Sequence, residues 1–531
     1  MRSPWPRNLV TRLESSRLVA YSLLAGALVG LAGLALRWAL GWLSEGAYRV
    51  IGYRPPGTPG EGGLMMSFGS VLPWGLIALV AVALLVSLFG GRQRDPLEGA
   101  VAAYHGSEPP ERPLPLGRSL LVLGLGHAAG LLVGRDALFA LAGGIVSRLG
   151  WRTLRLAAAD AQTLALACVA AGIGLALHAP LAAAVLVAEA LYRRFEFELE
   201  LLLPALLTSI AAYAVYGSVY GFSPLFQVSA YSVTASTWPL YAALALAVTL
   251  VAWVSVRLGT LAALTRLPWT GRALLALVYG LATAALFTQI PEVLGDGAGW
   301  LQIGLSGLGG PEMLWQGLLR AGLLVLALLG GLGQGVLPAV SAGGLIGVGV
   351  AALWPGLGLD PAVAGLVGAG AFLTVTYNAP IAATLLAVTW GGDALLPAAF
   401  IGTLLAHWVS GETSLLSTQV RTRAASGAHA LAPTPPLAIS PLPAPEPLPL
   451  TPPETDGELH RLPCPPSWAG QPASEVRWPP GVQLVGLVHA GAVQEIGPGR
   501  LLTSGDELLV LAEPGAYRSL AEALQPAPAP A

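Results

Sequence analysis

The chain has 531 residues, of which 54% are hydrophobic and only 11% are charged, and its formal net charge is -2 at pH 7. A globular core cannot bury so large an apolar share, so this composition excludes an ordinary soluble protein and predicts a polytopic membrane protein whose partner is the lipid bilayer. The slightly negative charge also argues against a nucleic-acid partner, which needs a basic protein face.

Residues 1–17 are basic and precede the first apolar run. Arginines stand at positions 2, 7, 12 and 17, and the run extends from Leu18 to Leu43. The run is too long and its flank too basic for a cleaved signal peptide, so we expect a membrane span whose N-terminal side lies in the cytoplasm. A loop rich in proline and glycine follows at 53–63, and a second span is predicted at Val71–Leu88.

The membrane domain is expected to cover residues 18–420 as an all-α bundle of helices of unequal length. A polar stretch at 90–117 separates the first two spans from the rest. Several later segments are shorter than the roughly 20 residues of a full crossing, which indicates tilted helices and partial crossings. The spans predicted outside the repeat described next are Leu120–Val133, Ala137–Ile145, Leu201–Val219, Leu240–Val256, Ala273–Thr288, Leu318–Val336, Ala342–Leu353 and Leu395–Val409.

One apolar stretch occurs twice. The segment DAQTLALACVAAGIGLALHAPLAAAVLVAE, Asp160–Glu189, returns as DPAVAGLVGAGAFLTVTYNAPIAATLLAVT, Asp360–Thr389. Each copy is interrupted by a His-Ala-Pro or Asn-Ala-Pro step, where proline ends one helix and begins another. Broken helices in both halves of a membrane protein indicate a transport site between two repeats, here about 90–220 and 310–420. The alternative is a chance similarity between two helices rich in alanine and leucine.

Asp136 is the most informative charged residue of the apolar region. It follows Gly134 and Arg135 and precedes the apolar segment ALFALAGGI. A helix start stabilises a carboxylate, and the same start can bind a free anion when the carboxylate moves away. Asp136 is therefore a candidate gate, with a capping residue paired to Arg135 as the alternative. Glu189 is the second candidate, and its alternative is an interfacial carboxylate.

Four apolar segments match, in order and spacing, the motifs of a known family. GRDALFALAGGIVSR at 134–148 is similar to a Gly-Arg-Glu-Gly-Pro helix start, and SAGGLIGVGVAAL at 341–353 resembles a Gly-x-Phe-x-Pro anion motif. HAPLAAAVLVAE at 178–189 and NAPIAATLLAV at 378–388 resemble Asn-Ala-Pro and Arg-Ala-Pro steps. The set resembles the CLC family of chloride channels and chloride/proton exchangers over about 91–417.

The resemblance implies a fold and a substrate. It implies a CLC-like inverted repeat of tilted and broken helices, and a homodimer in which each subunit carries chloride or a similar small anion along its own path. Asp136 would be the gate. The anion-binding residues that it implies are Gly134, Arg135, Gly343, Gly344, Leu345 and Ile346, the last two through their backbone N–H groups.

Two departures from the family bear on mechanism. Its anion-coordinating serine motif is replaced by Gly91-Arg92-Gln93-Arg94-Asp95 before Glu98, and the similar segment at 106–110 lies on the wrong side of Glu98. The family's inner proton-transfer glutamate falls on Ala190, and its pore tyrosine falls near Leu416. The loss of that glutamate favours a passive gated channel.

Two other transport functions stay open. The chain would be a chloride/proton antiporter if Asp136 and Glu189 carry protons. It would be a cation transporter if its tail acts as it does in potassium and sodium systems, which requires intramembrane carboxylates as ligands.

The tail changes character after residue 420. Residues 421–456 form a proline-rich linker, and 457–528 form a small cytoplasmic α+β domain with strands at Gln483–His489 and Asp506–Ala512 and a closing helix at Pro514–Leu524. The segment Glu458–Pro514 resembles the RCK (TrkA-C) regulatory domain of bacterial ion transporters. This resemblance implies a small-molecule ligand, a bacterial inner membrane and cytoplasmic termini.

No enzyme chemistry stands out. The 27 basic residues are all arginine, so no lysine can serve a phosphate loop or a Schiff base. The chain has no HExxH motif, and its histidines in apolar spans, His127, His178 and His407, are scattered. Its two cysteines, Cys168 and Cys464, suggest neither disulfides nor a metal cage. We therefore predict no enzyme activity, no cofactor and no metal site.

Overall fold

The computed structural model of the chain describes residues 7–61, 67–69, 71, 73–89, 95–106, 113–154, 158–261, 267–332, 335–426, 428, 458–464, 468–473, 476, 478, 480–489, 492–494, 501–503, 506–512 and 516. The chain divides into two compact units, Met1–Ala430 and Leu431–Ala531. Each unit has its own hydrophobic core.

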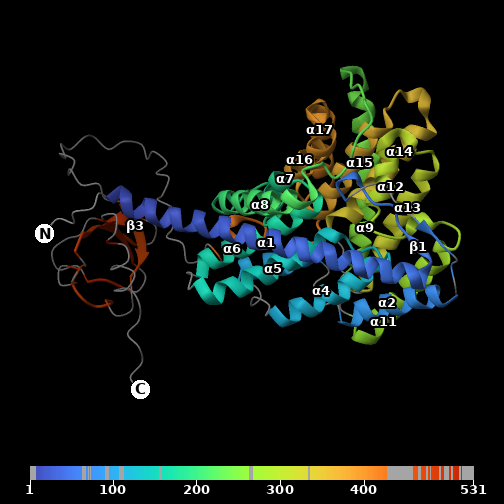
Figure 1. The fold of residues 1–531 in the computed structure, drawn as a ribbon. Coiled ribbons are helices and arrows are strands. Elements are labelled where there is room, and N and C mark those ends of the chain that lie inside the picture. The colour runs from blue at the N-terminus through green and yellow to red at the C-terminus, as the bar shows by residue number, and fades with distance from the viewer. Residues whose placement is uncertain are drawn as a thin grey trace. The chain divides into compact units, whose positions relative to one another are not determined.

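The first unit is helical, apart from a short pairing of β1 (Tyr53–Arg54) with β2 (Ser67–Phe68) (Figure 1). Its α-helices are α1 (Arg7–Ile51), α2 (Pro73–Phe89), α3 (Pro96–Tyr104), α4 (Pro113–Ala128), α5 (Arg135–Leu154), α6 (Ala158–Leu177), α7 (Pro180–Glu189), α8 (Leu199–Tyr220), α9 (Trp238–Gly259), α11 (Trp269–Phe287), α12 (Ala298–Ile303), α13 (Glu312–Leu329), α14 (Val336–Leu353), α15 (Pro361–Tyr377), α16 (Pro380–Gly391) and α17 (Leu396–Ser410). Short helical turns are η1 (Pro59–Glu61), η2 (Ala235–Thr237), η3 (Pro291–Val293), η4 (Gly304–Leu308), η5 (Pro355–Leu357), η6 (Asp393–Leu395) and η7 (Arg423–Ala425).

The predicted membrane class is confirmed. Within the described residues, eight helices are long and apolar enough to cross a membrane, while α2, α7, α15 and α16 are apolar but shorter. Large apolar side chains remain exposed on the outer helices, among them Trp408 and Leu250, as expected for surfaces that face lipid. The chain is therefore an integral membrane protein with helices of unequal length.

The helix break within each copy of the repeat lies where it was predicted. His178 ends the first broken helix at φ 52° and Asn378 ends the second at φ 57°, and these are the only non-glycine residues with positive φ in the described part of the chain. In both copies the next helix begins at a proline, Pro180 or Pro380, which needs no N–H partner there. The indole of Trp390 in α16 donates to the Leu177 carbonyl at 3.0 Å and so joins the two copies.

Two helix pairs pack through glycines placed against backbone. A Cβ at Gly143 in α5 would lie 2.1 Å from the Cys168 carbonyl oxygen in α6, and one at Gly347 in α14 would lie 2.1 Å from the Ala364 carbonyl oxygen in α15. α14 and α15 accordingly lie side by side (Figure 1). Gly343, which is 200 positions beyond Gly143, likewise packs against the Gly368 carbonyl oxygen in α15, so α5 in the first repeat and α14 in the second hold corresponding positions.

One predicted span joins two helices that are separate in the structure. The segment Leu318–Val336 was expected as a single span, but α13 ends at Leu329 and α14 begins at Val336. Between them Gly331 has φ 74° and Gly335 has φ 89°, conformations that glycine adopts without strain. The helices α3 and α12 were not predicted, because α3 lies in the stretch interpreted as polar and α12 has only six residues.

The second unit contains an antiparallel four-stranded sheet in the order β3-β6-β4-β5. Its strands are β3 (Glu458–Pro463), β4 (Val482–His489), β5 (Ala492–Gln494) and β6 (Glu507–Ala512), so β4 and β6 match the two predicted strands. Leu487, Leu508 and Val510 belong to its buried core. The predicted closing helix, most of the predicted linker and residues 107–110 of the serine-containing segment lie outside the described residues.

Candidate functional site

The carboxylate of Asp136 lies against the start of a helix from the other repeat. Asp136 is in the first turn of α5 and only 1% exposed. Its Oδ2 accepts a hydrogen bond from the Val336 N–H, and its Oδ1 accepts one from the Leu337 N–H at 3.2 Å. N–H groups in the first turn of a helix have no partner within that helix. The carboxylate therefore binds α14 as a free anion would.

Gly335 makes this close approach possible. It precedes α14 with φ 89°, and a Cβ at this position would lie 2.5 Å from Asp136 Oδ2. No other residue leaves room for the carboxylate in this backbone conformation. The sequence thus sets the geometry with a glycine at the start of α14 and an aspartate at the start of α5.

Arg135 points to a different partner. Its Nε lies 2.9 Å from Asp296 Oδ2 in an ion pair whose side chains are 7% and 8% exposed. Asp296 Oδ1 also accepts from the Ala298 N–H at 3.1 Å, at the start of α12. The guanidinium of Arg135 is thus bound to a carboxylate, which gives no support to its expected role as an anion ligand. Gly134 lies beside Asp136, and its carbonyl accepts from the Ala137 N–H at 3.1 Å.

The predicted second anion motif lies in α14, the helix whose start binds Asp136, but about two turns beyond the N–H groups that do so. Gly343, Gly344, Leu345 and Ile346 are buried in the interior of α14. Backbone N–H groups at such positions bond within their own helix, so those of Leu345 and Ile346 are not available to an anion. A Cβ on Gly343 would lie 2.4 Å from the Gly368 carbonyl oxygen, so this glycine serves helix packing.

A second carboxylate, absent from the sequence prediction, reaches the same helix start. Asp95 precedes α3 and is 3% exposed, and its Oδ1 accepts from the Leu97 N–H at 2.8 Å. Its Oδ2 accepts from the Gly335 N–H at 3.3 Å and from the hydroxyl of Tyr377, the last residue of α15. Two carboxylates therefore occupy three successive N–H groups, from Gly335 to Leu337.

One of these carboxylates, Asp95, accepts from a tyrosine to which the sequence did not point. The sequence comparison with the family pointed to the neighbourhood of Leu416, which is buried and whose N–H donates to Ser414 Oγ at 3.1 Å. Tyr377 stands one residue before Asn378, at the helix break of the second repeat. It is fully buried, so its hydroxyl is directed at Asp95 by the packing of α15.

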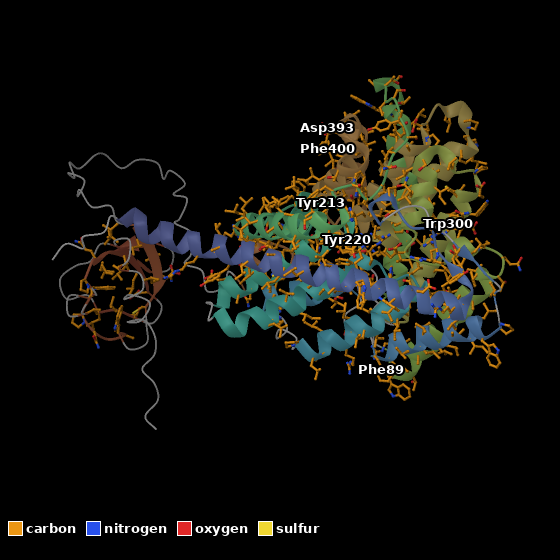
Figure 2. All side chains as sticks on the ribbon, in the orientation of Figure 1. Phe89, Tyr213, Tyr220, Trp300, Asp393 and Phe400 are labelled. Atoms are coloured by element: carbon orange, nitrogen blue, oxygen red, sulfur yellow. The ribbon has the colours of Figure 1, made fainter. Side chains whose placement is uncertain are left out.

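A basic cavity adjoins this site. It has a volume of about 280 Å³ and is lined by Arg135 together with Arg37, Arg54, His127, His178 and Asp296, among other residues. Arg37 in α1 is held by α8, since it donates to the Tyr216 hydroxyl at 2.8 Å and its guanidinium carbon lies 3.9 Å from the ring centre of Tyr220. Tyr220 is labelled in Figure 2. The excess of positive charge favours anions in this cavity.

Glu189 repeats the arrangement of Asp136 at another helix. It ends α7, is 3% exposed, and accepts from the N–H groups of Ile381 at 3.1 Å and Ala382 at 2.9 Å, in the first turn of α16. It is therefore not the interfacial carboxylate considered as an alternative. Ala190 follows it, buried, with its carbonyl accepting from Gln419 Nε2 at 2.7 Å. Glu189 thus binds the start of α16, whereas Asp136 binds the start of α14.

Comparisons with known proteins identify the family. The model of the voltage-gated chloride channel family matches residues 75–411. A CLC-type fluoride/proton antiporter structure superimposes with a TM-score of 0.63 at 21% identity, covering 77% of this chain and 99% of that one. A slow cyanobacterial Cl-/H+ antiporter gives 0.60 at 18%, covering 75% and 96%, and a eukaryotic CLC transporter gives 0.56 at 18%, covering 76% and 74%.

A search of curated proteins finds no match. The structural similarities, all below 25% identity, establish the fold, and the family model covers more than half of the sequence. The chain belongs to the voltage-gated chloride channel (CLC) family of anion transport proteins.

Proposed function

We propose that the chain conducts chloride or a similar small anion passively, through a path that Asp136 gates. The observation that carries the proposal is the pair of hydrogen bonds from Val336 and Leu337 to the Asp136 carboxylate. Hydrogen bonds to a charged group contribute about 1.5–3 kcal/mol each. A free anion of similar size gains the same contacts once the carboxylate leaves, so the two compete for one helix start.

The residues at positions 189 and 190 support passive anion conduction over proton-coupled exchange. Coupled exchange needs a group that takes up a proton from the gate and passes it on. Ala190 has no such group, and both oxygens of Glu189 are engaged at the start of α16. Glu189 would have to give up two hydrogen bonds, and leave two buried N–H groups without partners, before it could move as a carrier.

The second candidate is an anion/proton antiporter. Two of the similar structures are described as antiporters, one for fluoride and one for chloride. Asp95 also adds a second carboxylate to the site. Family membership favours an anion over the cation considered from the tail. A homodimer with cytoplasmic termini in a bacterial inner membrane is part of the same proposal.

Ion flux from liposomes that contain the purified full chain tests the proposal. Chloride efflux is followed with an ion-selective electrode and proton movement with an enclosed pH dye, for the natural chain and for Asp136→Ala. We expect chloride efflux without proton movement, and a faster rate in Asp136→Ala because the tethered anion is gone. Asp360→Ala is the matched control, since Asp360 also accepts from a helix start, at Ala362 and Val363.

The other outcomes separate the alternatives. Proton movement against its own gradient, driven by a chloride gradient, would contradict a passive channel and support the antiporter. Potassium flux without chloride flux would contradict anion transport altogether. An unchanged rate in Asp136→Ala would remove Asp136 from the role of gate.

A further inference from the structure

The two oxygens of Asp95 make different contacts. Oδ1 accepts from the Leu97 N–H and so caps α3, in which Pro96 occupies the first turn. Oδ2 turns the other way and accepts from Gly335 and Tyr377, which belong to the second repeat. The cap at α3 anchors the side chain. Asp95 is thus held in place, whereas Asp136 has both oxygens on α14 alone.

The start of α14 is fully occupied by these two side chains. Asp95 holds the Gly335 N–H, and Asp136 holds those of Val336 and Leu337. When Asp136 swings away, two N–H groups become free, but the charge of Asp95 stays beside them. A free anion placed there would face a fixed like charge at close range.

Among the described residues, no positively charged side chain pairs with Asp95. In the described part of the chain, neither Asp95 nor Asp136 forms an ion pair. The ionisable side chains that face the site from neighbouring elements are Glu98 on α3, Asp136 on α5, Tyr377 on α15 and the Asp296–Arg135 pair. Glu98 is itself bonded to Ser417, and α14 carries no ionisable side chain.

We propose that Asp95 is a second, fixed gating carboxylate of the anion path, which must hold a proton on Oδ2 before an anion can stay at the start of α14. The proton comes from hydronium in the path, which leaves water behind, so the step is favoured at low pH. The protonated oxygen then donates to the Tyr377 hydroxyl, and the Gly335 N–H is released to the anion. Two events open the path: Asp136 moves, and Asp95 is neutralised. This inference rests on the proposed function and adds a residue to it.

The test removes the charge of Asp95 and keeps its cap. Asparagine is as good a helix cap as aspartate, so Asp95→Asn retains the contact with Leu97. Asp360→Asn is the matched control, because Asp360 also caps a helix that begins with proline but lies at α15. Initial efflux of chloride and of fluoride is measured from liposomes containing the full chain, between about pH 5 and pH 8.

We expect Asp95→Asn to raise efflux at about pH 7.5 by at least about tenfold over the natural chain, since a neighbouring unit charge is removed. The rate should also lose much of its rise toward low pH, while Asp360→Asn behaves as the natural chain does. Tyr377→Phe is the second variant, and it should raise efflux because the charged Asp95 carboxylate loses a hydrogen-bond donor and is neutralised more readily. This variant keeps the test valid if Asp95→Asn does not fold.

The results distinguish this inference from the proposed function. If Asp136→Ala raises efflux while Asp95→Asn and Tyr377→Phe leave rate and pH profile unchanged, Asp95 is a helix cap only and the inference is overturned. If Asp95→Asn raises efflux and Asp136→Ala does not, Asp95 keeps its proposed role as a gating carboxylate and Asp136 is not the gate. If no form of the protein carries chloride or fluoride, both proposals are overturned.

Discussion

Three buried carboxylates, Asp95, Asp136 and Glu189, accept hydrogen bonds from the first N–H groups of a helix in the opposite repeat. Helix starts are stabilised by such charges, and buried carboxylates are stabilised by such donors. The same contact therefore serves two purposes. It joins the repeats to each other, and it keeps a negative charge at a place where a mobile anion can replace it.

Glu189 allows these two purposes to be separated. We expect Glu189→Gln to lower stability by about 1–3 kcal/mol, because the amide nitrogen cannot accept from the second N–H of α16. Anion efflux per folded protein should stay unchanged if conduction is passive. The measurements are thermal unfolding in detergent and chloride efflux with a pH dye.

Glu200→Gln is the control for this variant. Glu200 is 73% exposed and pairs with Arg423 at 2.7 Å, so its loss should change stability by no more than about 1 kcal/mol. A loss of proton-coupled chloride movement in Glu189→Gln alone would instead assign Glu189 to a proton path and favour the antiporter.

At the scale of helices, glycine contacts set how closely α14 packs against α15. The Cβ of an alanine at position 347 would lie 2.1 Å from a backbone oxygen, which has no rotamer by which to move away. We expect Gly347→Ala to push α14 from α15, to lower stability by about 1–3 kcal/mol and to alter anion efflux. Thermal unfolding and efflux from liposomes measure the two effects.

Gly322 provides a matched comparison within a neighbouring helix. It lies inside α13, and nothing lies within 4 Å of a Cβ added there. Gly322→Ala should therefore be neutral or stabilise by about 0.5–1 kcal/mol through helix propensity. Equal effects of the two substitutions would mean that close packing at position 347 is not what holds the helices together.

The sequence predicted those helices whose ends are marked by special residues. The breaks at His178 and Asn378 precede Ala-Pro and were predicted correctly, because proline cannot continue a helix. The end of α13 is marked by glycines within an apolar run, and an apolar run alone does not reveal a turn. The repeat itself held the missing signal: Asp160 and Asp360 are 200 positions apart, and the same offset from Arg135 leads to Gly335.

Asp95 was missed for a different reason. In the resemblance to the CLC family, Asp95 is the last residue of the segment that replaces the family's serine motif, and that replacement alone implies no role for it. Asp95 stands directly before Pro96, a pattern typical of a capped helix start, and this pattern would have allowed α3 to be predicted. Its second contact, with Gly335 and Tyr377, joins segments that are 240 and 282 positions away in the sequence. Contacts over that range depend on the packing of both repeats and not on local pattern.

At the scale of the whole molecule, the site belongs to one unit. Asp95, Asp136, Tyr377 and the start of α14 all lie within Met1–Ala430, and the sheet of the second unit has a separate core. The RCK-like role proposed for that second unit is therefore one of regulation and not of conduction. A ligand of that unit would act by changing the rate of the path, whose residues named above all lie in the first unit.

The last segment of the first unit fixes where the chain can be shortened. Ser417 donates to Glu98 on α3 through its N–H at 3.1 Å, Arg423 pairs with Glu198 at 3.1 Å, and Ser426 Oγ lies 2.8 Å from His105 Nδ1. The contacts with Glu98 and His105 hold α3, which is capped by Asp95, and the pair with Glu198 holds the same segment against the start of α8. Residues up to 426 are therefore part of the membrane fold.

We expect a chain that ends at Ala430 to fold, to conduct the same anion and to respond to Asp136→Ala as the full chain does, because every contact of the site is retained. A chain that ends at Ser414 should lose the support of α3 and fail to give a monodisperse peak in size-exclusion chromatography. Comparing the chloride efflux of the Ala430 form with that of the full chain then measures the effect of the second unit on the rate. A changed rate with an unchanged Asp136→Ala response would reveal regulation by that unit, whereas loss of all efflux from a well-folded Ala430 form would contradict the assignment of the path to the first unit.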